Sequence, residues 1–235
     1  MTTNAEEENK VDEEDFRVEL LPEDYAQYDL SFKLIVIGDS GVGKSCLTTK
    51  AVKNNFDDYY QATVGFEFLT FNMKINEFVI KMQIWDTCGQ EIYKSLISNF
   101  YRNSSLAIIL YSIDNKESFE HAENWLTDLK SQANPDVRIF LVGNKSDLEE
   151  ERKVTKEEGL KFKNDQGLDL FMETSAKTGY NARNVLIEAA KMLYADYLKY
   201  IEANPQEVKQ PGKQKKGDEL KADTPKNNGK KKGCC

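Results

Sequence analysis

Residues 38–45 constrain the fold of this chain more than any other stretch, because they read Gly-Asp-Ser-Gly-Val-Gly-Lys-Ser between two segments of different character. Residues 32–37, before them, are apolar and rich in β-branched side chains, which predicts a buried strand. The segment after them, from Lys44 to about Asn54, favours a helix. A glycine-rich turn between strand and helix can direct its backbone N–H groups at phosphate oxygens. The pattern therefore predicts a phosphate-binding loop.

Two side chains of this loop fit nucleotide chemistry. Lys44 can reach the β- and γ-phosphates, and the hydroxyl of Ser45 is a ligand for Mg²⁺. The positive end of the helix that begins there also favours an anion. A chance match is expected in about one chain in a hundred from average residue usage. The flanking strand and helix make that alternative much less favourable.

Strand and helix patterns alternate along the middle of the chain. Apolar or β-rich runs cover residues 66–75, 78–85, 106–113, 137–142 and 168–173. Asn76 and Glu77 alone separate the first two runs, which predicts a hairpin. Asp114 and Asn115 can cap a helix that runs through Trp125, and residues 182–201 have helical periodicity. This order predicts an α/β protein with three layers, a mostly parallel sheet and one antiparallel edge strand, and the phosphate-binding loop makes it one of the P-loop NTPase type.

Polar residues follow directly on several predicted strands. Asp86, Asn144 and Thr174 do so, and Gly38, the first residue of the phosphate loop, likewise follows a predicted strand. Ligands of such sheets bind at the carboxyl ends of the strands, so we expect these positions to converge on one edge. Asp86 can hold Mg²⁺, and Gln90 can orient the water that attacks the γ-phosphate. A lone Asp-x-x-Gly is more often an ordinary turn, but its place after the phosphate loop favours the metal site.

Residues 144–147 read Asn-Lys-Ser-Asp and favour recognition of guanine. The Asp147 carboxylate can accept two parallel hydrogen bonds from guanine N1–H and the exocyclic amine. Adenine lacks this pair of donors, and ATP would leave the acid unpaired at a cost of about 1–3 kcal/mol. The backbone N–H of Ala176, after Thr174 and Ser175, can meet the guanine oxygen. The plain alternatives are a solvated turn for Asp147 and a helix cap for Thr174 or Ser175.

Charge and cysteine usage divide the chain into three parts. Residues 1–30 carry 11 acidic and 2 basic side chains and few large apolar ones, which predicts a disordered acidic extension. Residues 31–203 form the predicted domain, and residues 204–235, with 9 Lys and 4 acidic side chains, a flexible basic tail. The four cysteines form no disulfide framework, which fits a reducing compartment. Neither a secretory signal nor a membrane span is recognisable, and a single His121 leaves little room for a His-based metal site.

With these motifs in this order, the chain resembles a small GTPase of the Ras superfamily, and further matches resemble the Rab family. The matching segments are residues 60–68 (Tyr-Gln-Ala-Thr-Val-Gly-Phe-Glu-Phe), 85–90 (Trp-Asp-Thr-Cys-Gly-Gln), Tyr101-Arg102, 143–148 (Gly-Asn-Lys-Ser-Asp-Leu), 173–177 (Glu-Thr-Ser-Ala-Lys) and Cys234-Cys235. The resemblance covers residues 31–203 and the last two residues.

The resemblance implies a six-stranded sheet with about five helices, and it assigns roles to residues. Thr63 would bind Mg²⁺ together with Ser45 and Asp86. Gly89 would donate its N–H to the γ-phosphate, and Gln90 would place the catalytic water. The nucleotide-binding set that it implies is Ser40, Gly41, Val42, Gly43, Lys44, Ser45, Cys46, Thr63, Gly89, Asn144, Lys145, Asp147, Ser175, Ala176 and Lys177.

The resemblance also implies a function: a monomeric GTP/GDP switch in vesicle trafficking, with no role in nucleic-acid binding. Its partners would be an exchange factor, a GTPase-activating protein, a GDP-dissociation inhibitor, a prenylation escort and effectors. Cys234 and Cys235 would carry lipids that anchor the chain to a membrane. We therefore expect it in the cytosol and on the cytoplasmic face of an endomembrane, with some segments similar to Golgi-type Rabs.

Two departures from the Rab pattern leave an alternative open. Cys88 stands where an Ala is usual, and residues 91–93 lack a common Arg, so Ile92 follows Gln90 and Glu91. Slow hydrolysis is expected in any case, because residues 46–65 contain no arginine that could act on the γ-phosphate. The alternative is a membrane scaffold that binds GTP with little or no hydrolysis. An ATP-using P-loop enzyme is disfavoured by Asp147.

Overall fold

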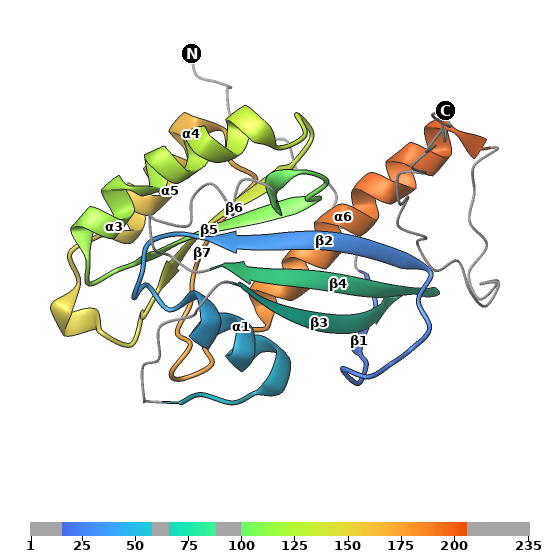
Figure 1. Cartoon of the computed structure of the whole chain (residues 1–235), viewed down its shortest axis with the longest axis horizontal. Coiled ribbons are helices and arrows are strands. Elements are labelled where there is room, and N and C mark those ends of the chain that lie inside the picture. Colours follow the sequence, from blue (N-terminus) through green and yellow to red (C-terminus); the bar gives the residue numbers. More distant parts are fainter. Residues whose placement is uncertain (1–15, 58–65, 88–99, 206–235) are drawn as a thin grey trace, which may run out of the picture.

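A computed structural model of the chain describes residues 16–57, 66–87 and 100–205. The strands within these residues form one sheet with the order β1-β3-β4-β2-β5-β6-β7 (Figure 1). They span Val18–Leu20 (β1), Leu30–Ile37 (β2), Phe66–Ile75 (β3), Phe78–Thr87 (β4), Leu106–Ser112 (β5), Arg138–Asn144 (β6) and Leu170–Glu173 (β7). Strand β3 is antiparallel to β4 and β1, and the other pairings are parallel. The predicted α/β class is confirmed.

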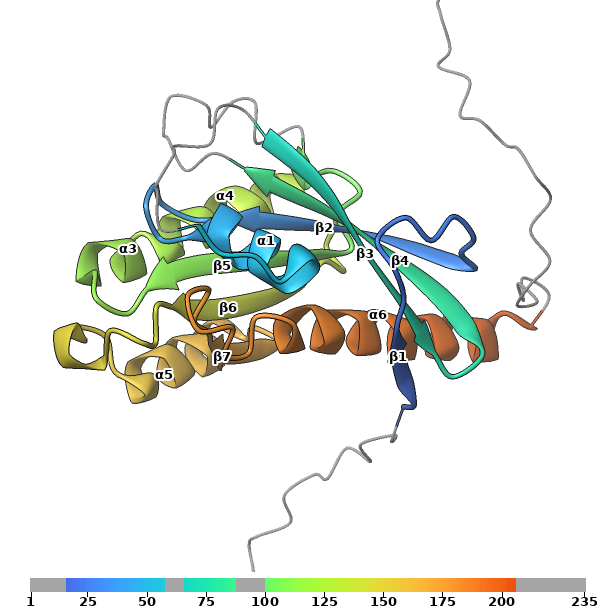
Figure 2. The same ribbon diagram turned by 90° about the horizontal axis from the view of Figure 1, so that it is seen from below.

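Helices cover both faces of the sheet (Figure 2). One face packs against α1 (Lys44–Lys53) and α6 (Asn184–Ala203), and the other against α3 (Lys116–Glu120), α4 (Ala122–Gln132) and α5 (Lys156–Gln166); η2 (Glu149–Glu151) is a short 3₁₀ helix. Because both faces are covered, β5 is buried at every position, which explains its continuous apolar sequence. None of the helices in the described ranges is long and apolar enough to cross a lipid bilayer.

Most predicted elements are present with small shifts at their ends. The hairpin of β3 and β4 turns at Asn76, whose φ of 52° lies in the left-handed region that Asn tolerates. The long helix expected through Trp125 is instead two helices, α3 and α4, which meet at His121. Its predicted start is correct, because the Asn115 side chain accepts a hydrogen bond from the Ser118 N–H at 3.2 Å.

The segment from Phe16 to Asp29 corrects the prediction that residues 1–30 are a disordered extension. Strand β1 pairs with the edge of β3, so the sheet has seven strands where the resemblance implied six, and a second antiparallel pairing. The ring of Phe16 packs edge-on against Tyr194 of α6, with ring centroids 5.4 Å apart. The buried Asn72 amide also donates to the carbonyls of Pro22 and Glu23, at 3.0 and 2.9 Å.

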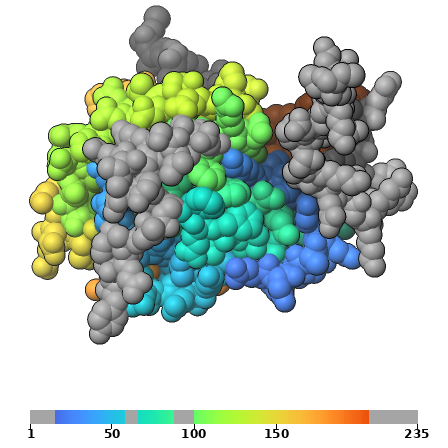
Figure 3. All heavy atoms as spheres, viewed as in Figure 1, coloured from blue at the N-terminus to red at the C-terminus, as the bar shows by residue number. Residues whose placement is uncertain are grey.

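The same N-terminal segment forms part of the molecular surface. In Figure 3 its blue atoms border the teal atoms of β3 and β4. Backbone pairing with β3 and one aromatic contact therefore order a stretch whose acidic composition alone predicted disorder.

Candidate functional site

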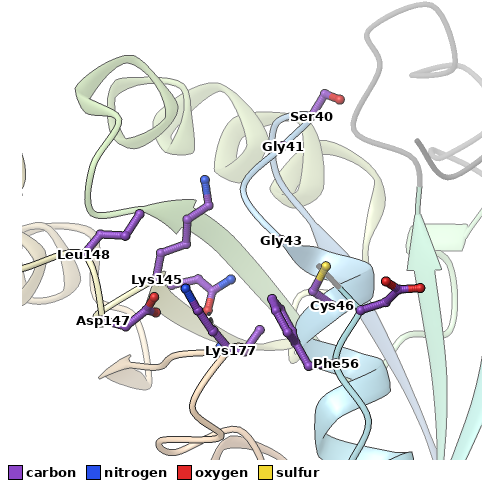
Figure 4. A pocket seen from close by; sticks show the side chains of 12 residues that line it. Ser40, Gly41, Gly43, Cys46, Phe56, Lys145, Asp147, Leu148 and Lys177 are labelled. Atoms are coloured by element: carbon purple, nitrogen blue, oxygen red, sulfur yellow. Dashed lines mark hydrogen bonds between the residues drawn. The ribbon is translucent and has the colours of Figure 1, made fainter. Parts of the chain in front are cut away.

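A cavity of about 530 Å³ lies at the carboxyl edge of the sheet, where β2, β6 and β7 end. Its walls come from the loop after β2, the start of α1, the residues after α1 and the loops after β6 and β7 (Figure 4). The lining residues are Ser40, Gly41, Gly43, Cys46, Phe56, Asp57, Asn144, Lys145, Asp147, Leu148, Ala176 and Lys177. Segments far apart in the sequence thus converge as predicted, around a space of a size that suits a small ligand.

The loop of residues 38–43 depends on two glycines. Gly38 has a φ of 140°, and a Cβ there would lie 2.1 Å from the carbonyl oxygen of Leu110 on β5. Gly43 has a φ of 96°, and a Cβ there would lie 2.4 Å from Nδ2 of Asn144. A larger residue at either position would strain the backbone and push against its neighbour. The glycine spacing of the motif is therefore required by the close approach of this loop to β5 and β6.

Lys44 provides a buried cation inside the loop. Its Nζ donates hydrogen bonds to the carbonyl oxygens of Gly38 and Asp39, at 2.9 and 2.7 Å. Helix α1 begins at Lys44, and within the described residues no side chain caps it at Gly43. The N–H groups of a first helical turn lack partners within the helix, so this end of α1 and the ammonium group together form a site for an anion.

Asp147 and Lys145 lie on the opposite wall of the cavity (Figure 4). Oδ1 of Asp147 accepts a hydrogen bond from the Ser175 hydroxyl at 2.5 Å, so the loop after β7 orients this carboxylate. Lys145 has a φ of 62°, and its Nζ lies 3.7 Å from Oδ2 of Asp114. A fixed carboxylate beside a lysine stem can bind a planar base that presents paired N–H donors.

Asn144 connects three segments of the site. Its Nδ2 donates to the carbonyl oxygen of Val42 at 2.9 Å, although Val42 itself is not among the residues that line the cavity. Its Oδ1 accepts from the Thr174 hydroxyl and the Ala176 N–H, both at 3.2 Å. The Ala176 N–H, which we expected to meet a guanine oxygen, thus donates to Asn144 in this structure. Asn144 holds the phosphate loop against both loops on the opposite wall.

The family model described as Ras family matches residues 33–195, about two thirds of the chain and every residue that lines the cavity. The chain belongs to the Ras family. It is therefore a small GTPase, a switch that binds GTP and GDP and hydrolyses GTP, and exchange factors, activating proteins and effectors are its general classes of partner.

Ser45 and Asp86 of this Ras-family protein form a pair of oxygen donors beside the loop. The Ser45 hydroxyl donates to Oδ2 of Asp86, and Oδ1 of Asp86 has no hydrogen-bond partner within the described residues. Burial raises the pKa of Asp86 to about 6, although the Ser45 hydrogen bond and the Lys44 charge lower it. A buried carboxylate with an unpaired oxygen beside a hydroxyl fits Mg²⁺, which prefers oxygen ligands. These residues therefore fit the Mg²⁺ that Ras-family proteins typically bind.

One ion pair, behind the loops after β6 and β7, was not predicted from the sequence. Arg152 donates to both carboxylate oxygens of Glu173, at 2.6 and 3.0 Å, and Glu173 is only 6 % exposed. The pair braces the end of β7, where residues 174–177 begin. The sequence did contain a signal for this ion pair. Glu173 is an acidic residue at the end of a predicted buried strand, and a buried acid needs a partner. Phe56 and Asp57 were also missed, since they follow α1 without a recognisable motif.

Several predicted site residues lie outside the described residues. These are Thr63, Gly89 and Gln90, and the predicted lipid-bearing residues Cys234 and Cys235. Their roles remain predictions from the sequence.

Proposed function

We propose that this small GTPase is a Rab-type switch that recruits effectors in intracellular vesicle trafficking. The observation that carries the proposal is an exposed aromatic cluster formed by Phe66, Phe68, Trp85 and Phe100. Phe66 and Phe68 are 53 % and 46 % exposed. Soluble proteins rarely expose adjacent large apolar side chains unless a partner covers them.

The rings of this cluster touch one another and come from β3, β4 and the residue Phe100, which lies outside the strands. Ring centroids of Phe66 lie 5.5 Å from Trp85 and 4.8 Å from Phe100, and Trp85 lies 5.1 Å from both Phe68 and Phe100. Phe66 directly follows the segment with Thr63, and Phe100 follows the segment with Gly89 and Gln90. A partner that binds these rings therefore contacts residues that directly follow, in the sequence, both segments proposed to contact the γ-phosphate. Such a partner can distinguish GTP from GDP.

The cavity is assigned to the nucleotide. Asp147, oriented by Ser175, would accept the guanine N–H donors, and Lys145 would lie along the ring. The phosphates would lie against the loop of residues 38–45, within reach of Lys44. Mg²⁺ would be held by Ser45, Asp86 and Thr63, and it supplies charge neutralisation for the phosphates. The remaining proposed contacts are Ser40, Gly41, Val42, Gly43, Cys46, Gly89, Asn144, Ala176 and Lys177.

Hydrolysis in this site is an in-line displacement. Water oriented by Gln90 attacks the γ-phosphorus, and the bond from that phosphorus to the β–γ bridging oxygen breaks. Lys44 and the loop N–H groups stabilise the charge that develops on the phosphate oxygens. Because residues 46–65 supply no arginine, an activating partner that provides one would accelerate the reaction by about 10³–10⁵-fold.

Single-turnover GTP hydrolysis tests the enzymatic part of the proposal. We expect slow hydrolysis by the native protein and still slower hydrolysis by Gln90→Leu. If native protein and Gln90→Leu both bind GTP and hydrolyse it at equal, negligible rates, the alternative is favoured. That alternative is a GTP-binding membrane scaffold whose altered residues around Cys88 and Ile92 prevent hydrolysis.

Microscopy and membrane flotation of the tagged full-length chain test the trafficking part. Native protein should associate with an endomembrane, Golgi-type by similarity. A Cys234→Ser/Cys235→Ser variant should stay in the cytosol and should no longer bind the prenylation escort or the GDP-dissociation inhibitor.

The aromatic cluster is tested by a second variant. Phe66→Ala/Phe68→Ala should keep GTP hydrolysis and lose the native pattern of membrane sites. Leu160→Ala, which trims an exposed side chain on α5, is the matched control. Identical distribution of native and cysteine-free protein would contradict the anchor.

A further inference from the structure

The phosphate loop carries a carboxylate that is turned away from the cavity. Oδ1 of Asp39 accepts a hydrogen bond from Nε1 of Trp125 at 2.8 Å, and Oδ2 lies 2.6 Å from Nδ1 of His121. Because an ionised carboxylate only accepts hydrogen bonds, Nδ1 of His121 is the donor. His121 lies at the junction of α3 and α4, and Trp125 is one turn further along α4. Two residues of one helical face thus hold both oxygens of Asp39.

The backbone of Asp39 takes part in the site itself. Its carbonyl oxygen accepts the hydrogen bond from Nζ of Lys44 at 2.7 Å, and Ser40, the next residue, lines the cavity. A negative side chain in a loop that binds phosphates opposes the binding of an anion unless it is held at a distance. The two N–H donors hold the Asp39 carboxylate on the side of α3 and α4 and stabilise its charge by hydrogen bonds.

We propose that His121 and Trp125 are positioning residues for the nucleotide site. They hold the Asp39 carboxylate against α3 and α4, which keeps its charge away from the phosphates and fixes the carbonyl that meets Lys44. This inference rests on the proposed nucleotide site and adds to it a means of regulation. A partner that shifts α3 and α4 away from the loop would weaken the hold on GDP.

Trp125→Phe is the first test, because it keeps a buried aromatic ring and removes the N–H donor. We expect GDP release from the full-length protein to become about tenfold faster, the effect of losing one hydrogen bond to a charged group. Tyr111→Phe is the matched control. Tyr111 belongs to the same core cluster, and its hydroxyl has no partner within the described residues, so its removal should leave release unchanged. Equal release from the Trp125 variant and native protein would overturn the proposal.

The Asp39→Ala background separates positioning from packing. Without the carboxylate, Trp125→Phe no longer removes a hydrogen bond to Asp39, so it should change GDP release by less than about twofold. A purely structural role for the indole would act equally in both backgrounds. An undiminished effect of Trp125→Phe in Asp39→Ala would therefore overturn the proposal.

His121 gives an independent readout, because it is the only histidine of the chain. Its Nδ1–H should give a single downfield NMR signal in native protein that disappears in Asp39→Ala. His121→Asn retains a donor near the Nδ1 position and should release GDP within about threefold of native, whereas His121→Ala should release it about tenfold faster. Glu117→Gln, which changes the exposed carboxylate 4.0 Å from Nε2 of His121, is the control and should match native protein.

The outcomes distinguish this inference from the proposed function. Native protein without GDP affinity would overturn both. Native protein that binds GDP tightly, with release unchanged in Trp125→Phe and His121→Ala, would overturn the positioning role alone.

Discussion

Base preference in this site depends on a single carboxylate. Asp147→Asn replaces one acceptor oxygen by an amide donor, which can no longer accept both guanine N–H groups. GDP affinity should fall by about 1–3 kcal/mol, roughly 5- to 150-fold, and xanthosine diphosphate should gain relative to GDP. Calorimetry with both nucleotides measures the change. Asp165→Asn, at an exposed position on α5, is the control; a full GDP preference in Asp147→Asn would contradict the role of Asp147.

Asp86 makes the metal-free protein sensitive to pH. Its pKa of about 6 in the folded state lies above the ordinary value of 3.8. Folded protein therefore holds a proton that the unfolded chain releases between these values, and stability falls as pH rises through this window. Asp86→Asn should raise the free energy of unfolding by roughly 2–3 kcal/mol at about pH 7.5 and by about half as much near pH 5.

Urea unfolding without nucleotide and with EDTA measures this difference at both pH values. The same substitution should weaken Mg²⁺ binding to the GDP-loaded protein, because it removes a charged ligand. A stabilisation that is equal at the two pH values would show that the buried charge is not its cause.

One side chain of β3, Asn72, helps to hold the segment that directly follows β1. Asn72→Ala removes the two hydrogen bonds to the carbonyls of Pro22 and Glu23. Unfolding free energy should fall by about 1–2 kcal/mol. Hydrogen exchange should accelerate at the Asn76 amide, which donates to Arg17, and at the Leu21 amide, which donates to Asn72. Asn124→Ala, on the exposed face of α4, should change neither quantity.

The strands and helices show which parts of the fold local sequence determines. The β3–β4 hairpin and the buried β5 were predictable, because a turn at Asn76 and a continuous apolar run are local signals. Strand β1 was not, because its three residues lie among acidic side chains and are ordered by pairing with β3, next to Phe16, whose ring contacts Tyr194. The junction of α3 and α4 at His121 also has no sequence signal that we recognised.

The same distinction applies to the site. The phosphate loop and the base-side loop were predictable, since each motif carries its chemistry within a few residues. Asp39 and His121, by contrast, are separated by 82 positions, and Arg152 and Glu173 by 21. Such partners are brought together by the order of the strands in the sheet. A single sequence can therefore indicate that a buried charged side chain requires a partner, but it does not show which residue that partner is.

Nucleotide binding should stabilise the entire protein, because the cavity is the place where its separate segments meet. Walls from the ends of β2, β6 and β7 surround it, and Asn144 already links them by hydrogen bonds. A ligand that binds only the folded state adds about 4 kcal/mol at a thousandfold excess over its Kd. For a domain of this size each kcal/mol raises Tm by about 2–4 °C, so GDP with Mg²⁺ should raise Tm by roughly 8–16 °C.

Thermal unfolding with GDP, ADP and no nucleotide measures this gain. ADP should give little of it, because its base cannot supply the paired donors that Asp147 accepts, and Asp147→Asn should reduce the gain from GDP. Since the phosphates of both nucleotides are the same, the difference between their shifts isolates the contribution of the base. Equal shifts with GDP and ADP would mean that only the phosphate wall of the cavity is in use, and the assignment of its opposite wall to guanine would fail.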